Sequence, residues 1–584
     1  MKSKKKRTIP TQVSWLWERL TARSQELASK PAVMTILPAS TYARSWQRFY
    51  DITCGLVSFL HRQGIAPGDV VAIDAPMRCE SLILWSACQY LGAAVQFLPI
   101  DMRSADMHSE CLALDVRLVL ADDPNRVKSW LSWQQADTSQ RIILYADVKT
   151  SDGEMMDQVV GWPIPEGICS FEAAVERFGS DPARSPCQNY SDDTVLAYIY
   201  SQGTHSGERR IALTNASLRL HSDEICERLE LAEGTRVMIG MDSSHAIHLK
   251  LFAACLARGA SLILLNHPPG ILESIRQAKP NIVFLLPHAL AQLTDELIQS
   301  PEQSAFKARW HRFCVQAGKF RNRNKQPYLK WSSPIIKGLC LSPIKRQLGT
   351  DIKAFVSFGA PFDSHVAEFF SYLDIPTLNA YTVADVGGIA HLHTFKNEGG
   401  FLRCIEPRIK GGVLSVKIRR KGASLISTDD YVIEDARCGL CVRRNQSFTL
   451  AGGKTVDSTA IRDAILREPL IEELLIFGQD APFLTALVYL AATDLQRWAS
   501  SQKIPNADDF LRMSQHQKIY AHIKAHIDAC NLTRATGEAI RKFAILPRPI
   551  KADARVLSPC GLVRRFEAES KYAPILRSFY HEDF

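Results

Sequence analysis

Short apolar runs that alternate with segments of helical periodicity constrain the fold of this chain more than any other feature of its sequence. Apolar residues recur at helical spacing over 46–60 and over 81–91, whereas 70–74 and 116–120 are short apolar runs typical of buried strands. A Gly-Ile-Ala-Pro-Gly-Asp turn separates the first helical segment from the first of these strands. This alternation predicts an α/β domain with largely parallel sheets flanked by helices.

The length of the chain requires more than one domain. A single hydrophobic core organises roughly 100–200 residues, and this chain has 584. The alternation resumes after residue 190 and continues to about 426, where polar, turn-forming residues follow. Beyond them, strand and helix patterns mix as in a small α+β domain. We therefore predict a basic lead-in tail over 1–28, a large domain over 29–442 and a small domain over 443–584.

The charge balance and the cysteine content limit the classes of binding partner and the cellular compartment that we expect for this chain. Lys and Arg total 70 against 61 Asp and Glu, and the net charge of +9 is too mild for a specific nucleic-acid binder of this length. No apolar stretch follows the basic segment 1–7, so we expect a solvated tail rather than a secretory signal, with weak adhesion to anionic membranes or nucleic acid as the alternative. The sequence contains no run of about 18 apolar residues, so no membrane-spanning helix is predicted. The 15 cysteines then indicate reduced thiols in the cytoplasm, with peripheral membrane contact left open.

One loop has the composition of a phosphate-binding site. A strand-like run over 195–200 leads into the small, hydroxyl-rich and basic stretch 201–210, and a helix is predicted from about residue 216. Backbone N–H groups and hydroxyls of such a loop can face an anion while a cation neutralises it. A surface hairpin or loop is the alternative interpretation of the same pattern.

The segment 200–218, which reads YSQGTHSGERRIALTNASL, resembles the loop Y-T-S-G-T-T-G-x-P-K-G-V-x-L-T-H-x-N-L of the adenylate-forming enzymes without a gap. Gly203 and Thr204 are among the matching residues, and the family lysine falls on Arg209. Two flexible glycines of the family fall on Ser206 and Arg210. The resemblance implies that Gly203 and Thr204 bind the nucleotide and that Arg209 supplies positive charge for catalysis.

Three further stretches resemble the same family, in the same order along the chain. Segment 241–245 resembles L-P-L-x-H and ends at His245, and 279–287 resembles the P-T-x-x-x-x-V-P stretch of long-chain acyl-CoA synthetases. Segment 357–362 resembles S-G-G-A-P-L, a strand end at the adenine pocket. The nucleotide-binding residues that this last match implies are Gly359, Ala360 and Pro361.

The stretch 375–385 resembles I-P-x-x-x-G-Y-G-x-T-E of the family. Tyr381 matches the aromatic residue that stacks on adenine. The glutamate that helps to hold Mg²⁺ has become Asp385, and the threonine that contacts the α-phosphate has become Ala384. The resemblance therefore implies Asp385 as the metal ligand, one methylene shorter than in the family.

The C-terminal part carries four more resemblances. Asp430 falls on the ribose-binding aspartate of T-G-D, and the hinge signature R-x-K/D-E places a ribose-binding and catalytic role on Arg443 and the hinge on Asn445. Segment 451–461 resembles S-G-G-K-N-V-A-P-x-x-I, which assigns a thiol-acceptor region. Its residues are Gly452, Gly453 and Lys454. In 557–565, which resembles L-T-P-T-L-K-V-K-R, the catalytic lysine has become Leu562.

Together these matches extend over roughly 30–580 and resemble the long-chain fatty acyl-CoA synthetase branch of the adenylate-forming enzymes. The resemblance implies that a mobile C-terminal domain rotates about Asn445. It also implies ATP-dependent, Mg²⁺-dependent activation of a long-chain fatty acid, followed by transfer to CoA or to a carrier-protein thiol. The catalytic roles fall on Arg209, His245, Asp385 and Arg443.

The substitutions at catalytic positions leave a second function class open. Leu562 has no charge to place between the carboxylate and the α-phosphate, and the loss of such a group can cost about 10²–10³ in rate. Arg564 and Arg565 are candidate substitutes because they lie close in sequence. The alternative is a non-catalytic relative that binds nucleotide or acyl groups, or that acts as an interaction partner.

Overall fold

The structure is a computed structural model in which part of the chain is described. The described residues are 13–36, 41–99, 102, 104–135, 141–146, 168–176, 186–187, 190–200, 210–240, 246–265, 270–299, 345, 347–349, 351–359, 364–383, 386, 388–393, 399–410, 413–419, 425–433, 440–442, 447–451, 455–502, 504, 509–532, 534, 539–550, 553, 556, 563 and 565–581.

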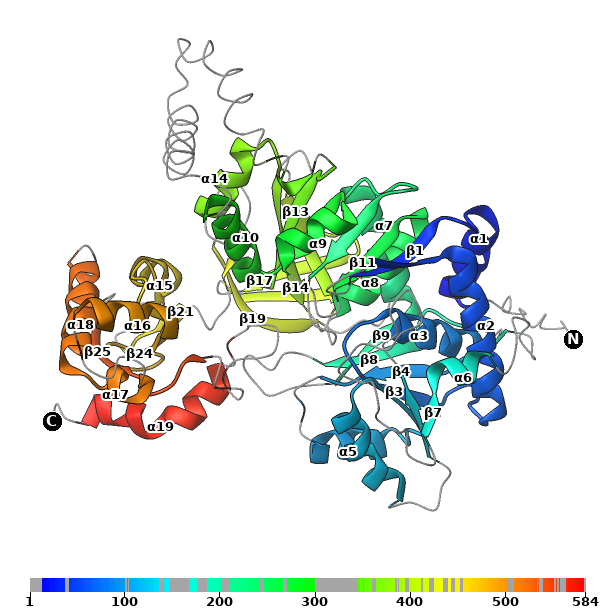
Figure 1. Ribbon diagram of the computed structural model, residues 1–584, viewed down its shortest axis with the longest axis horizontal. Helices are drawn as coiled ribbons and strands as arrows, with labels where there is room; N and C mark the ends of the chain where they lie inside the picture. Colours follow the sequence, from blue (N-terminus) through cyan, green and yellow to red (C-terminus); the bar gives the residue numbers. More distant parts are fainter. Residues whose placement is uncertain are drawn as a thin grey trace, which may run out of the picture. The chain divides into compact units, whose positions relative to one another are not determined.

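The chain divides into two compact units, which are described separately (Figure 1). The first comprises 1–201, 210–407 and 416–426. The second comprises 202–209, 408–415 and 427–584. The domain boundary expected at residue 443 stays a prediction.

The largest sheet lies in the first unit, where nine of the described strands are ordered β16-β15-β14-β13-β12-β10-β11-β1-β2. Their bounds are β1 Pro31–Ile36, β2 Thr41–Ser45, β10 Arg236–Ile239, β11 Ser261–Leu265, β12 Ile282–Leu285, β13 Ala354–Phe358, β14 Thr377–Val383, β15 Gly388–His393 and β16 Gly399–Phe401. The strands from β14 to β1 are parallel, and antiparallel pairs occupy both edges. The strands β10, β11, β12 and β13 are mostly apolar, as is usual for a parallel sheet that helices cover on both faces.

Seven other described strands form the second sheet of this unit, ordered β7-β6-β5-β3-β4-β8-β9. Their bounds are β3 Val70–Asp74, β4 Ala94–Phe97, β5 Leu118–Ala121, β6 Ile142–Tyr145, β7 Ile168–Ser170, β8 Val195–Tyr200 and β9 Arg210–Thr214. Every neighbouring pair is parallel except β8 and β9. The predicted α/β class with largely parallel sheets is confirmed.

The helices of the first unit begin and end at local sequence signals. Their bounds are α1 Trp15–Glu26, α2 Trp46–Arg62, α3 Cys79–Leu91, α4 Ser104–Ala113, α5 Pro124–Gln135, α6 Phe171–Glu176, α7 Asn215–Arg228, α8 Ala246–Arg258, α9 Ile271–Ala278, α10 Pro287–Gln299 and α14 Ser364–Tyr372. The hydroxyl of Ser45 accepts a hydrogen bond from the backbone N–H of Arg48 and caps α2. Gly92 ends α3 with φ of +82°, and a Cβ there would lie 2.8 Å from the sulfur of Cys187.

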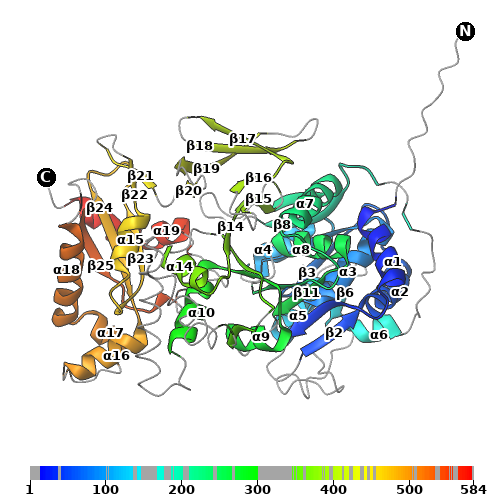
Figure 2. The same cartoon turned by 90° about the horizontal axis from the view of Figure 1, so that it is seen from above.

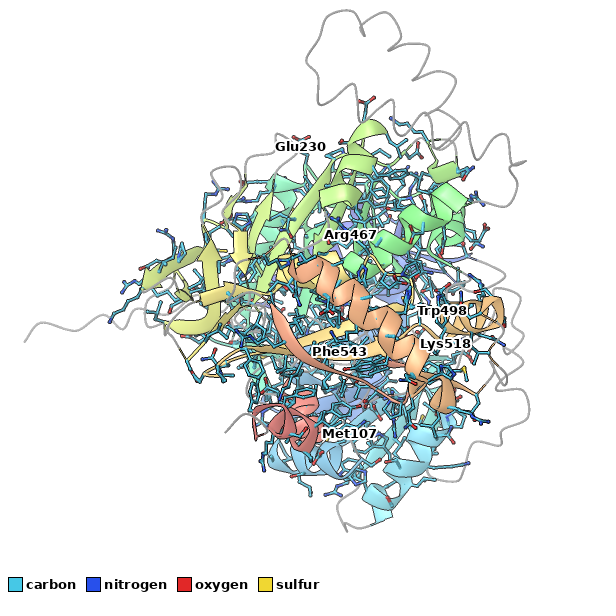
Figure 3. All side chains as sticks on the ribbon, turned by 90° about the vertical axis from the view of Figure 1, so that its left-hand side faces the viewer. Met107, Glu230, Arg467, Trp498, Lys518 and Phe543 are labelled. Atoms are coloured by element: carbon cyan, nitrogen blue, oxygen red, sulfur yellow. The ribbon has the colours of Figure 1, made fainter. Side chains whose placement is uncertain are left out.

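The second unit contains a three-stranded sheet in its described part. The strands β23 (Ile471–Phe477), β24 (Leu484–Leu490) and β25 (Ile540–Ile545) pair in this order, the first pair antiparallel and the second parallel. Alternate residues of β23 enter two different apolar clusters. Leu474 and Ile476 lie on one face of the sheet, and Leu475 and Phe477 lie on the other. Figure 3 looks onto α18 of this unit, with Lys518 labelled on it.

The remaining described elements are short strands and the helices of the second unit. The strands β17 Ile405–Lys410, β18 Val413–Ile418, β19 Ile426–Ile433 and β20 Leu440–Val442 form one sheet, and β21 Ser447–Thr449 pairs with β22 Thr455–Asp457. The helices are α15 Thr459–Ile465, α16 Ala492–Ser501, α17 Phe510–Ser514, α18 Gln517–Asn531 and α19 Arg565–His581. The predicted α+β class of the C-terminal domain is confirmed. Within the described residues, no helix combines the length and apolarity that crossing a bilayer requires.

Candidate functional site

Only a few of the predicted site residues belong to the described part of the chain. Those outside it are Gly203, Thr204, Arg209, His245, Ala360, Pro361, Ala384, Asp385, Arg443, Asn445, Gly452, Gly453, Lys454, Leu562 and Arg564. Gly359 and Tyr381 are described, and Asp430 is described only as a backbone position of β19. The roles of all these residues stay predictions, whereas the structure describes the elements on either side of them.

The strands that flank the loop 201–209 form a hairpin. β8 and β9 pair antiparallel with Tyr200 opposite Arg210, directly at the two ends of the loop. The predicted order of strand, loop and helix is therefore wrong in one respect, because strand β9 precedes α7. The hairpin alternative describes the connection correctly. β9 lies at the edge of its sheet and is partly exposed, so its residues lack the apolar run of a buried strand.

Both ends of the hairpin loop are held by one carboxylate from a distant helix. Glu110 of α4 accepts hydrogen bonds from the Tyr200 hydroxyl at 2.7 Å and from the Arg210 guanidinium at 2.8 Å. Gln96 of β4 donates to the same hydroxyl at 2.5 Å. Burial, with the hydrogen bond to Glu110, raises the pKa of Tyr200, so the phenol stays a neutral donor. Positive charge at Arg210 is thus already paired at the foot of the loop.

Helix α7 follows β9 and is unusually polar for a buried helix. It begins at an N-cap residue, Thr214, whose hydroxyl accepts from the N–H of Ser217 at 3.4 Å. Its buried polar side chains are Asn215, Ser217, His221, Ser222 and Glu224. Buried polar groups need partners, so the contacts of α7 show what the helix is fixed to.

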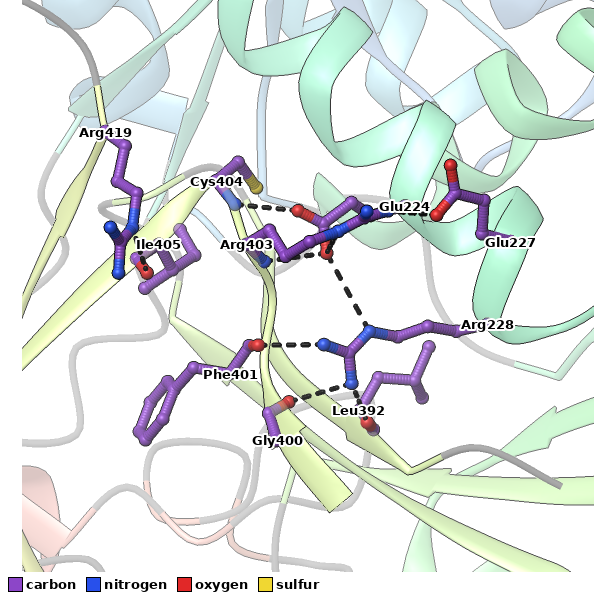
Figure 4. A network of polar contacts seen from close by, with 10 residues as sticks. All are labelled: Glu224, Glu227, Arg228, Leu392, Gly400, Phe401, Arg403, Cys404, Ile405 and Arg419. Carbon is purple, nitrogen blue, oxygen red and sulfur yellow. Dashed lines mark hydrogen bonds and ion pairs between the residues drawn. The ribbon is translucent and has the colours of Figure 1, made fainter. Parts of the chain in front are cut away.

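The C-terminal half of α7 is bound to strands β15 and β16 and to the residues between β16 and β17 (Figure 4). The carboxylate of Glu224 accepts from the backbone N–H groups of Arg403 and Cys404, both at 2.7 Å. Arg228 donates in turn to three backbone carbonyl oxygens, those of Leu392, Gly400 and Phe401. Because Glu224 is only 6% exposed, these charge-assisted hydrogen bonds are shielded from water.

Several predicted site segments follow parallel strands of the nine-stranded sheet. His245 ends the stretch after β10, Gly359 directly follows β13, and Asp385 comes two residues after β14. These strands run in the same direction, in the order β14-β13-β12-β10, so their carboxyl ends share one edge. Ligands of open α/β sheets bind at this edge.

The described residues at this edge agree with a close backbone approach. Gly359 has φ of +89°, and a Cβ there would lie 3.1 Å from the Leu286 side chain. Tyr381, on β14, is half-buried and pairs with His391 of β15. In the second unit, the hydroxyl of Thr428 donates to the carbonyl of Leu414 at 2.7 Å, two residues before Asp430 on the same strand.

The described residues hold no cluster of three or more His, Cys, Asp or Glu side chains that could bind a metal ion. The carboxylate that the sequence assigns to Mg²⁺, Asp385, lies outside the described residues.

Sequence reasoning missed the polar anchors of the site scaffold. Glu110 lies in a helical stretch 100 residues before Arg210, and no local motif marks it. Lys250 gives a clearer signal, because it lies between Leu249 and Leu251 in a mostly apolar helical stretch. In the structure it is fully buried.

The chain belongs to the AMP-binding enzyme family. The family matches residues 20–411, and the AMP-binding enzyme C-terminal domain matches residues 445–583. The predicted membership in the adenylate-forming enzymes is therefore confirmed.

The curated relatives that are similar to this chain include long-chain fatty acid–CoA ligases. A long-chain fatty acid–CoA ligase of Mycobacterium bovis is 23% identical over 592 residues, covering 91% of this chain and 93% of that protein. Long chain acyl-CoA synthetase 3 of Arabidopsis thaliana is 23% identical over 505 residues, covering 82% of this chain and 70% of that protein.

Solved structures share the fold. The A domain of a carboxylic acid reductase from Segniliparus rugosus, in complex with AMP and a carboxylic acid, has a TM-score of 0.70 at 13% identity, with 99% of this chain and 95% of that chain covered. A benzoate CoA ligase from Burkholderia xenovorans has a TM-score of 0.64 at 13% identity, with 95% and 99% covered. At these identities the likeness shows the fold alone.

Proposed function

We propose that this protein activates a long-chain fatty acid with ATP and then passes the acyl group to a thiol. A carboxylate oxygen of the fatty acid attacks the α-phosphorus of ATP, and the bond to pyrophosphate breaks. A thiolate of CoA or of a carrier protein then attacks the acyl carbonyl, and AMP leaves. The observation that carries the proposal is the match of both family domains in sequence, together with relatives named as long-chain fatty acid–CoA ligases over more than nine-tenths of their length.

The residues that we assign to nucleotide binding follow the family motifs. Tyr381 stacks on adenine, while Asp430 and Arg443 bind the ribose. Gly203, Thr204 and the backbone around Gly359 complete the nucleotide site, with Arg209 facing the phosphates. Since the chemical step brings two anions together, positioning and charge neutralisation supply most of the catalysis. The position of Gly359 at the carboxyl edge of the sheet supports this assignment.

Mg²⁺ is the cofactor that we propose beside ATP. When bound, it neutralises charge on the phosphates and polarises the α-phosphorus. The chain's own contribution is the carboxylate of Asp385, which follows β14 at the same edge as Gly359. In the second step, we propose that a rotation about Asn445 brings the region of Gly452, Gly453 and Lys454 to the thiol acceptor.

The substitution at Leu562 favours a second candidate, a relative that binds nucleotide or acyl groups without turnover. Two measurements separate the candidates. The first is ATP-dependent pyrophosphate release with a panel of fatty acids, in the presence of hydroxylamine to trap the activated acyl group. The second is the affinity for ATP alone, measured by calorimetry. Release that depends on a long-chain acid supports the ligase. ATP binding without release across the panel supports the non-catalytic relative. If the protein neither binds ATP nor releases pyrophosphate, the ligase and a nucleotide-binding relative are both contradicted.

A further inference from the structure

A lysine without a place in the family motifs is buried in the first unit. Lys250 lies on α8, is fully buried, and has apolar neighbours on both sides in the sequence. A lysine is rarely buried unless its amine is hydrogen-bonded. Its contacts therefore indicate why an amine is kept at this position.

The amine of Lys250 meets three polar atoms, all on α7. It donates to the carbonyl oxygen of Ser217 at 2.7 Å and to its hydroxyl at 2.9 Å, and it lies 2.8 Å from Nδ1 of His221. Burial lowers the pKa of both Lys250 and His221. As an ammonium, Lys250 donates to all three atoms, and as a neutral amine it donates to two and accepts from His221. The three contacts form in either state.

Two side chains, Lys250 and Ser217, connect three parts of the chain that neighbour predicted site residues. Ser217 lies in the first turn of α7, which follows the hairpin of loop 201–209. The hydroxyl of Ser217 also donates at 3.4 Å to the carbonyl of Val386, the residue after Asp385. Lys250 itself lies five residues after His245, at the start of α8. Lys250 thus connects α8 to the first turn of α7, and Ser217 connects that turn to Val386.

We propose that Lys250 is a positioning residue of the nucleotide site, which through Ser217 fixes the first turn of α7 against Val386. The inference rests on the proposed nucleotide site and adds to it a residue that touches no substrate. A misplacement of about 1 Å at an active site can cost on the order of 10² in rate. We expect Lys250→Met to weaken ATP binding about tenfold, the loss that corresponds to roughly one hydrogen bond.

The control is a variant that loosens the C-terminal end of α8, the helix that carries Lys250. Arg23 of α1 donates to the carbonyl oxygens of Leu256 and Ala257, at 3.0 and 2.6 Å. Arg23→Met therefore loosens α8 at its C-terminal end and leaves the contacts of Lys250 with α7 in place. Both variants should unfold at a lower temperature than the wild type, but only Lys250→Met should change the ATP dissociation constant and the KM for ATP. A lower folded fraction reduces kcat and leaves both constants unchanged, so a purely structural role gives a different result.

Ser217→Ala provides a second, milder variant in case Lys250→Met does not fold. It removes the hydroxyl that joins Lys250 to Val386 and keeps the amine, and we expect ATP binding to weaken severalfold with KM for the fatty acid unchanged. Calorimetry with ATP and Mg²⁺ on the full chain measures the constants. Wild-type affinity in Ser217→Ala, or equal loss in Arg23→Met, overturns the inference alone. A wild-type protein that binds no ATP overturns the proposed function together with it.

Discussion

A buried ion-pair network joins β2 to the start of α3 and makes the stability of the first unit depend on pH. Glu80, in the first turn of α3, pairs with Arg44 of β2 and with Arg78, both at 2.8 Å. Burial alone would raise the pKa of Glu80, but the two guanidinium groups lower it from 4.5 to about 2. A lowered carboxyl pKa stabilises the fold above its unfolded value and loses that stabilisation as pH falls from about 4.5 to 2.

Glu80→Gln removes this charge and keeps the shape of the side chain. From the pKa of about 2 against 4.5, ionised Glu80 contributes about 3 kcal/mol at pH 7 and about 1.5 kcal/mol at pH 3. We expect the variant to lose free energy of unfolding by about these amounts, because Arg44 and Arg78 lose their ion pairs with Glu80, and Arg78 keeps a longer pair with Asp122 at 3.5 Å.

Urea unfolding followed by tryptophan fluorescence tests the magnitude, since all of the 10 tryptophans except Trp498 precede residue 332 and report on the first part of the chain. Glu273→Gln on α9 is the matched control, because its pair with Arg276 is exposed and should contribute less than about 1 kcal/mol. Equal losses at pH 7 and pH 3, or a loss no larger than that of the control, would refute the reasoning.

Three further changes test the candidate site and the second unit. Asp430→Ala should weaken ATP binding about tenfold or more in calorimetry, because a buried charge-assisted hydrogen bond is worth about 1.5–3 kcal/mol; equal affinity removes Asp430 from the site. Leu562→Lys should raise acyl-adenylate formation by up to roughly 10²-fold in the pyrophosphate assay, and no change there would instead point to Arg564 or Arg565. Asp553→Asn should speed hydrogen exchange in β24 at pH 7. The reason is that, although burial alone would raise the pKa of Asp553, Lys571 and two tyrosines lower it, so its ionised form stabilises the unit above its ordinary pKa of 3.8. Unchanged exchange would contradict this.

The fold could be predicted where burial leaves a local pattern in the sequence. The helix expected over 46–60 is α2, the strand expected over 70–74 is β3, and the strand expected over 116–120 overlaps β5. A buried face has to be apolar, and its period follows from helix or strand geometry. The strand β9 was missed because it lies at a sheet edge and is stabilised by its pairing with β8, which no short window of sequence reveals.

The candidate site could be predicted as a set of motifs but not as an arrangement. A motif gives the identity of residues such as Tyr381 because the match is local. The partner of Arg210 is Glu110, 100 residues away, and the partner of Lys250 is Ser217, 33 residues away on another helix. Such contacts depend on how strands are ordered in the sheets, and sequence periodicity contains no information on that order.

The polarity of α7 has a physical consequence for a site that depends on placing charges. Apolar contacts are non-directional, so a helix held only by leucines can slide or rotate at little cost. Hydrogen bonds are directional, and α7 is held by them at both ends, by Lys250 near its start and by the contacts of Glu224 and Arg228 near its end. Its rotation and translation are therefore fixed against β15 and α8. Since stabilisation of developing charge requires groups that are already in place, a rigid helix after the hairpin of β8 and β9 is what such chemistry needs.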